Sequence, residues 1–177
     1  DAPAVDLLLN NFHFAVVEDE KGKHYFVDGR DVTEVIRSRF VTARVSAVSA
    51  LPQVRSALLN IQHEFGAKQN AVFEGRDLGT VVFPQAEIKI FLTADPRVRA
   101  ERRLNEIAAK NSQEAQGIDR NTILVDILER DRLDSSRELA PLRCPEGAFT
   151  IDTTQLSIDD VVESIVKYCA TLYPQSI

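Results

Sequence analysis

The first third of the chain changes its hydrophobic period. Residues 11–17 and 23–27 alternate loosely between apolar and polar side chains, with turn-like residues 18–22 between them. This pattern predicts a hairpin of two short strands that follows the end of a helix. From Asp31 the period becomes helical, and this helix is predicted to end at Pro52 because proline interrupts a helix.

A second helix is predicted directly after Pro52. Its apolar positions are spaced four, three and four residues apart, which places them on one face. They are Val54, Leu58, Ile61 and Phe65. His63 lies in the same helix, and we interpret it as a residue of the surface or of the core edge.

Short apolar runs alternate with helical patterns in the rest of the chain. The predicted strands are residues 70–73, 87–93 and 149–152. The last of them precedes a final helix, whose start at Ser157 and Asp160 resembles a capping box and whose apolar stripe includes Cys169. Strands that alternate with helices indicate a parallel, helix-covered sheet. The predicted fold class is therefore α/β, with the hairpin as a small attached lobe.

Composition limits the classes of function. The 177 residues carry 21 Lys and Arg against 27 Asp and Glu, a formal net charge of -6. This balance argues against a nucleic-acid or membrane surface spread over the whole chain. No apolar run approaches the roughly 18 residues of a membrane span, and two cysteines are too few for a disulfide framework or a zinc site. The net charge does not exclude a local basic pocket. We expect a cytoplasmic protein.

Charged side chains gather in three places that a plain scaffold would not need. The first, residues 74–80 (Glu-Gly-Arg-Asp-Leu-Gly-Thr), directly follows a predicted strand, where open α/β sheets bind ligands. The residues of the second cluster are spaced four and three positions apart, which places them on one helix face. On such a face, two arginines can hold a phosphate beside a carboxylate. It consists of Arg130, Asp134 and Arg137. The third is a run of four arginines that repel one another unless an anion lies among them. They are Arg97, Arg99, Arg102 and Arg103.

Each cluster also has a plainer interpretation. Residues 74–80 can be a turn with a surface ion pair, the second cluster a solvated helix face, and Glu101 and Glu106 can neutralise part of the third. Together the clusters indicate a pocket that binds a phosphoryl group and can transfer it, because that chemistry depends on positioning and positive charge. The sequence contains no Gly-x-x-x-x-Gly-Lys-Ser/Thr phosphate loop, and its one Gly-Lys pair, Gly22-Lys23, lacks the preceding glycine.

Two segments carry a family resemblance. Residues 75–84, Gly-Arg-Asp-Leu-Gly-Thr-Val-Val-Phe-Pro, and residues 88–94, Ile-Lys-Ile-Phe-Leu-Thr-Ala, closely resemble the bacterial-type cytidylate kinases. Further similar stretches are residues 31–37, 52–59, 129–142 and 152–154. The resemblance implies a nucleoside monophosphate kinase fold, with a parallel core of the P-loop NTPase type and a small antiparallel sheet in the CMP-binding lobe. It also implies a monomer that transfers the γ-phosphate of ATP to CMP or dCMP with Mg²⁺.

The resemblance also implies which residues read the base. Ser46, Arg55 and Asp77 match the positions that contact cytosine. The chemistry agrees, because a carboxylate accepts a hydrogen bond from the exocyclic amino group of cytosine. Uracil presents a carbonyl at that position, which would leave Asp77 facing another acceptor.

A second set of matching residues serves the phosphate. The resemblance implies that Arg76, Arg130 and Arg137 hold the CMP phosphate and that Asp134 holds the sugar hydroxyls. The residues that match the beginning of the lid, where arginines close over the transferred phosphate, are Arg99, Arg102 and Arg103. With Arg130 and Arg137 these make up the expected catalytic arginines.

The resemblance divides the chain into four parts. These are a CMP-binding lobe (1–69), core strands with the Gly-Arg-Asp motif (70–100), a lid region (101–129) and the remaining core with the last strand and helix (130–177). The lid segment between Arg103 and Arg130, which includes the polar stretch 111–116 and Gly117, is slightly long for the family. The family begins with a P-loop and a Ser-Gly-x-x-Tyr-Arg segment that this sequence does not contain, so we expect the carboxy-terminal three-quarters of a longer kinase, inactive alone. The alternative is a non-catalytic module that binds pyrimidine nucleotides without ATP.

Overall fold

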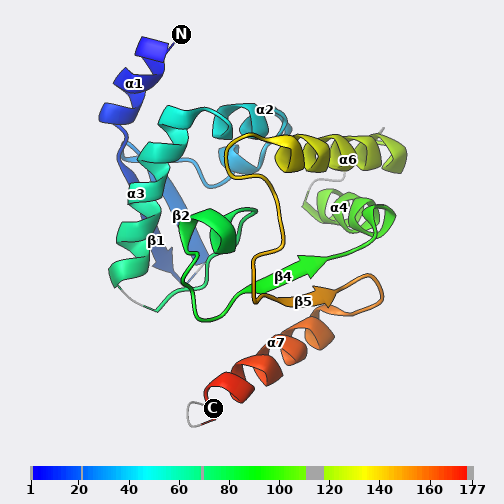
Figure 1. The fold of residues 1–177 in the computed structure, drawn as a ribbon. Helices are drawn as coiled ribbons and strands as arrows, with labels where there is room; N and C mark the ends of the chain where they lie inside the picture. The colour runs from blue at the N-terminus through cyan, green and yellow to red at the C-terminus, as the bar shows by residue number, and fades with distance from the viewer. Residues whose placement is uncertain (1, 21, 69, 111–117, 175–177) are drawn as a thin grey trace. The chain divides into compact units, whose positions relative to one another are not determined.

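The computed structural model of the protein describes residues 2–20, 22–68, 70–110 and 118–174. The chain divides into two compact units, Asp1–Val72 and Phe73–Ile177 (Figure 1). Each unit is described by itself.

The first unit begins with helix α1 (Ala2–Asn10) and an antiparallel sheet in the order β1 (Phe14–Asp19), β2 (Gly22–Val27) and β3 (Arg30–Asp31). The register of the predicted hairpin runs from Phe14 opposite Val27 to Asp19 opposite Gly22. Between β2 and β3, Asp28 has a φ angle of 50° and Gly29 has a φ angle of 75°, so both lie in the left-handed region. Positive φ at both central positions is typical of a two-residue type I′ hairpin turn. The predicted hairpin is confirmed, and β3 extends it.

Helices α2 (Arg39–Ser49) and α3 (Pro52–Lys68) complete the first unit. The prediction that a helix begins at Asp31 is wrong. Thr33 is held at the sheet, because its hydroxyl accepts a hydrogen bond from the Tyr25 amide at 2.9 Å and its own amide donates to the Asp31 carboxylate at 2.8 Å. A 3₁₀ turn (Val35–Arg37) follows, and α2 begins only after Ser38 caps it.

The second predicted helix is confirmed as α3. Its first residue is Pro52, a position where the missing amide of proline costs no helical hydrogen bond. Val54 is buried, and Phe65 packs edge to face against Phe14 with ring centroids 5.9 Å apart. His63 is exposed, as its surface interpretation predicted.

The second unit contains a parallel pair of strands, β4 (Ile90–Thr93) and β5 (Phe149–Asp152), with Ile90 opposite Phe149. The predicted strand at 149–152 and the parallel pairing are confirmed, whereas the strand predicted at 87–93 is formed only from Ile90 to Thr93. The prediction of a strand at residues 70–73 is wrong: these residues form no strand, and Val72 is fully exposed. An apolar run becomes a strand only where a neighbouring strand takes its backbone hydrogen bonds, and within the described residues β4 and β5 pair with each other.

Three long helices accompany this sheet. They are α4 (Pro96–Lys110), α6 (Arg120–Ser136) and α7 (Ile158–Leu172). Helices α4 and α6 lie side by side, and α7 follows β5 (Figure 1). The predicted capping box of Ser157 and Asp160 is present, and Tyr168 of α7 stacks on Phe149 of β5 at 4.4 Å between ring centroids. Among the described residues, no helix is both long and apolar enough to cross a membrane.

Candidate functional site

The Gly-Arg-Asp segment leads into a wide helical turn, Leu78–Val82. The amides of Val82 and Phe83 donate to the carbonyls five residues before them, Asp77 and Leu78, at 3.3 and 2.6 Å. Such π-type turns occur frequently at functional sites. At Gly79 a Cβ atom would lie 2.8 Å from Cγ of Pro145, so only glycine allows this close approach. The turn thereby fixes the position from which Arg76 and Asp77 extend.

Asp134 of α6 is the centre of the charged site. Its side chain is 2% exposed, and its Oδ2 lies 2.8 Å from Nη1 of Arg76. On the same helix, Arg130 Nε lies 3.8 Å from Oδ2, and Nη2 of Arg137, the residue directly after the helix, lies 3.0 Å from Oδ1. The predicted helix face therefore holds for Arg130 and Asp134, whereas Arg137 pairs with the same carboxylate from just beyond the end of the helix.

Asp131 adds a second carboxylate that the sequence reasoning did not assign a role. Its Oδ1 accepts a hydrogen bond from Arg76 at 2.8 Å, and its Oδ2 lies 2.7 Å from Nη2 of Arg99 on α4. Its position three residues before Asp134 on the same helix was the available signal. We call the resulting group the arginine cluster. Its members are Arg76, Arg99, Arg130, Asp131, Asp134 and Arg137.

The arginine cluster carries an excess of positive charge. Four guanidinium groups face two carboxylates, which leaves two positive charges unbalanced within the cluster. Burial opposes ionisation of Asp131, but hydrogen bonds from Arg99 and Arg76 outweigh it and lower its pKa. Burial, followed by repulsion from Arg76, lowers the pKa of Arg130. An anion with two charges, such as a phosphate monoester, would relieve this imbalance.

Hydrogen bonding in the cluster is also incomplete. The buried Nε atoms of Arg99 and Arg130 have no hydrogen-bond partner among the described residues. Because an arginine presents donors in a fixed fork, two such groups with unused donors can still bind oxygen atoms of a ligand.

The structure separates the three predicted lid arginines. Arg99 joins the arginine cluster. Arg102 instead donates to the hydroxyl and the carbonyl of Thr153, just after β5, at 2.9 and 2.6 Å. Arg103 pairs with Glu106 on the same helix at 2.6 Å. A role over the transferred phosphate therefore stays a prediction for Arg102 and Arg103, and the lid stretch 111–117 lies outside the described residues.

The predicted base-reading residues occupy both units. Ser46 lies half-buried on α2, and Arg55 of α3 donates to the carbonyl of Ser49 at 3.0 Å. Asp77 lies in the second unit, half-buried at the start of the wide turn, where its carbonyl accepts from Thr80. Their joint contact with cytosine stays a prediction.

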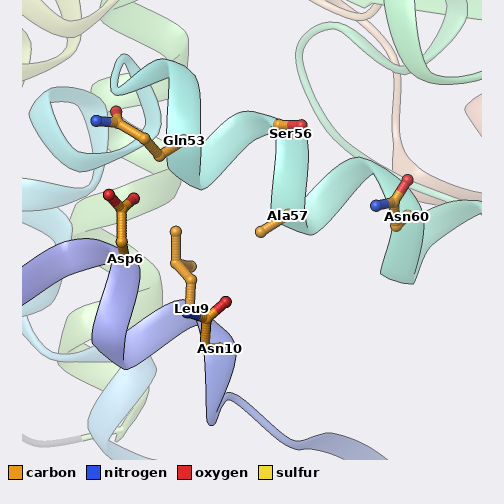
Figure 2. A pocket seen from close by; sticks show the side chains of 7 residues that line it. All are labelled: Asp6, Leu9, Asn10, Gln53, Ser56, Ala57 and Asn60. Carbon is orange, nitrogen blue, oxygen red and sulfur yellow. The ribbon is translucent and has the colours of Figure 1, made fainter. Parts of the chain in front are cut away.

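The first unit also has a shallow pocket of about 400 Å³ between α1 and α3 (Figure 2). Its lining residues are Asp6, Leu9, Asn10, Gln53, Ser56, Ala57 and Asn60. This lining contains a carboxylate and no lysine or arginine, so it does not suit a phosphate.

No metal centre is formed by the described residues, because they bring together no three His, Cys, Asp or Glu side chains that could hold an ion. In the arginine cluster, both carboxylates are already paired with guanidinium groups. This donor set does not fit Mg²⁺, which prefers oxygen ligands free of competing cations.

Comparison with known proteins identifies the relatives of the chain. The family model described as cytidylate kinase matches residues 1–171. The cytidylate kinase of Protochlamydia amoebophila is 46% identical over 172 residues, which are 97% of this chain and 75% of that protein. The cytidylate kinase of Pseudomonas paraeruginosa is 44% identical over 156 residues (88% of this chain, 66% of that protein), and that of Carboxydothermus hydrogenoformans is 41% identical over 167 residues (94% and 73%).

The chain thus spans about two thirds to three quarters of the length of these relatives. The predicted family and its α/β fold are confirmed. The Gly-Arg-Asp turn and the arginine-rich helix face agree with this match. The chain belongs to the cytidylate kinase family.

Proposed function

We propose that the complete protein transfers the γ-phosphate of ATP to CMP or dCMP. The family supports this reaction, since the relatives are named cytidylate kinases. The observation that carries the proposal for this chain is the arginine cluster, with four guanidinium groups on two carboxylates. Phosphoryl transfer requires positioned positive charge more than a covalent nucleophile.

In the proposed reaction, Arg76, Arg130 and Arg137 hold the phosphate of CMP. Their positive charge offsets the repulsion between this phosphate and the incoming γ-phosphate and orients the attacking oxygen. Asp134 keeps the three guanidinium groups together. Its predicted contact with the sugar hydroxyls would use a carboxylate that is already paired with arginines. ATP and Mg²⁺ belong to the proposal through the kinase family.

In the proposed reaction, Asp77 selects the cytosine base together with Ser46 and Arg55. The Asp77 carboxylate would accept a hydrogen bond from the exocyclic amino group of cytosine. UMP would place a carbonyl oxygen there, and a buried pair of acceptors without a proton between them is costly. Sites built on such polar contacts discriminate strongly between substrates.

The test is a comparison of CMP and UMP as acceptors for the complete protein. We expect kcat/KM for CMP to exceed that for UMP by about 100-fold or more, and Asp77→Ala to bring the ratio close to one by reducing turnover of CMP. Asp126→Ala, which removes an exposed carboxylate of α6, is the matched control and should keep the preference. Equal turnover of CMP and UMP by the unmutated protein would refute the proposed function.

A further inference from the structure

Asp131 is placed between arginines that come from two other parts of the fold. Arg76 reaches it from the Gly-Arg-Asp segment and Arg99 from the beginning of α4. Each carboxylate oxygen has a different arginine, at 2.8 Å on Oδ1 and 2.7 Å on Oδ2. The side chain of Asp131 is 26% exposed, so water screens these pairs only in part.

Both arginines depend on this carboxylate for their position. Nη1 of Arg76 lies 2.8 Å from Oδ1 of Asp131 and 2.8 Å from Oδ2 of Asp134, so the two carboxylates together fix its direction. For Arg99, Asp131 supplies the ion pair that links α4 to the arginine cluster. Without the charge of Asp131, the two guanidinium groups would repel each other.

The carboxylate itself is badly suited to touch a nucleotide phosphate. Both groups would be anionic, because the arginine contacts keep Asp131 ionised, and its two oxygens are already occupied. A group of this kind influences the reaction through the side chains that it orients, as the partners of metal ligands and catalytic histidines do.

We propose that Asp131 is a positioning residue, which holds Arg76 and Arg99 in the geometry that phosphoryl transfer needs. This inference rests on the proposed function and deepens it. Removing the negative charge leaves all four positive charges of the cluster in place, so CMP should still bind. The guanidinium groups of Arg76 and Arg99 should lose their fixed orientation, so the rate of the chemical step should fall.

The test compares Asp131→Asn with Glu129→Gln in the complete protein. Glu129 lies on the same helix and accepts two hydrogen bonds from Arg132, at 2.8 and 2.7 Å, but it is exposed and outside the cluster. For Asp131→Asn we expect kcat with CMP to fall by about 10- to 100-fold, the loss typical of misplaced catalytic groups, and KM for CMP to change by less than about threefold. Glu129→Gln should leave both within about twofold of the unmutated values.

A second variant, Asp131→Glu, keeps the charge but moves the carboxylate by one methylene. It should retain more of kcat than Asp131→Asn and still lose more than Glu129→Gln, with KM for CMP unchanged. If Asp131→Asn does not fold, as thermal unfolding would show, the same split between kcat and KM in Asp131→Glu decides the question.

Two results would overturn the positioning role. One is a kcat for the Asp131 variants that matches the Glu129→Gln control, and the other is a loss that appears in KM for CMP alone. Either result with normal CMP turnover by the unmutated protein leaves the proposed function intact. Absence of CMP turnover by the unmutated protein would instead refute both.

Discussion

Replacing Asp134 by asparagine tests the most concentrated charge interaction of the second unit. The change keeps the shape of the side chain and removes its charge. In the structure this charge lies 2.8 Å from Arg76, 3.0 Å from Arg137 and 3.8 Å from Arg130, in a side chain that is 2% exposed. After the substitution, four guanidinium groups of the arginine cluster would share Asp131 as their one remaining carboxylate.

The expected loss follows from burial. Removing one partner of a buried ion pair typically costs about 3–5 kcal/mol, because the remaining charge is left uncompensated. Arg76 keeps its contact with Asp131 at 2.8 Å, so the lower end of this range applies, about 3 kcal/mol. For a chain of this size, such a loss lowers the unfolding temperature by about 6–12 °C.

Urea denaturation followed by circular dichroism measures the loss, and hydrogen exchange of the α6 amides shows whether it lies in the second unit. Glu129→Gln is the control, since its pair with Arg132 is exposed and screened by water. Added inorganic phosphate should stabilise Asp134→Asn more than the unmutated chain, because the cluster then has a larger charge excess. A loss no larger than that of the control would refute the assignment of Asp134 as the residue that holds the arginines.

Two further substitutions test contacts outside the cluster. Arg102→Met should lower the free energy of unfolding by about 2 kcal/mol, because the charged hydrogen bonds to Thr153 are lost. The neighbouring Arg103→Met should cost less than about 1 kcal/mol, and equal losses in thermal unfolding would contradict this difference. Gly79→Ala should lower the free energy of unfolding by about 1–3 kcal/mol, because its Cβ atom would clash with Pro145, and adding Pro145→Ala should recover part of this loss. An unchanged stability of Gly79→Ala in the same measurement would contradict the close approach of the turn to Pro145.

Local periodicity predicted the parts of the structure that depend on near neighbours. The four-three-four spacing from Val54 to Phe65 predicted α3, and the pairing of Ser157 with Asp160 predicted the start of α7. The same principle placed Arg130 and Asp134 on one face, because residues four apart are neighbours on a helix, and it brought Arg137 close to them although the helix ends at Ser136. The Gly-Arg-Asp segment and its surroundings were specific enough to predict the family.

The tertiary structure decided which of these local pieces meet. Arg76 and Asp131 are 55 residues apart, and Arg102 and Thr153 are 51 apart, so no helical or strand period relates them. Arg99 and Arg102 lie in one basic run of the sequence, but on α4 they contact different partners. Arg99 pairs with Asp131 of the arginine cluster, whereas Arg102 donates to Thr153 just after β5. Chain pattern determines the face on which a charge lies, whereas its partner depends on which elements pack against that face.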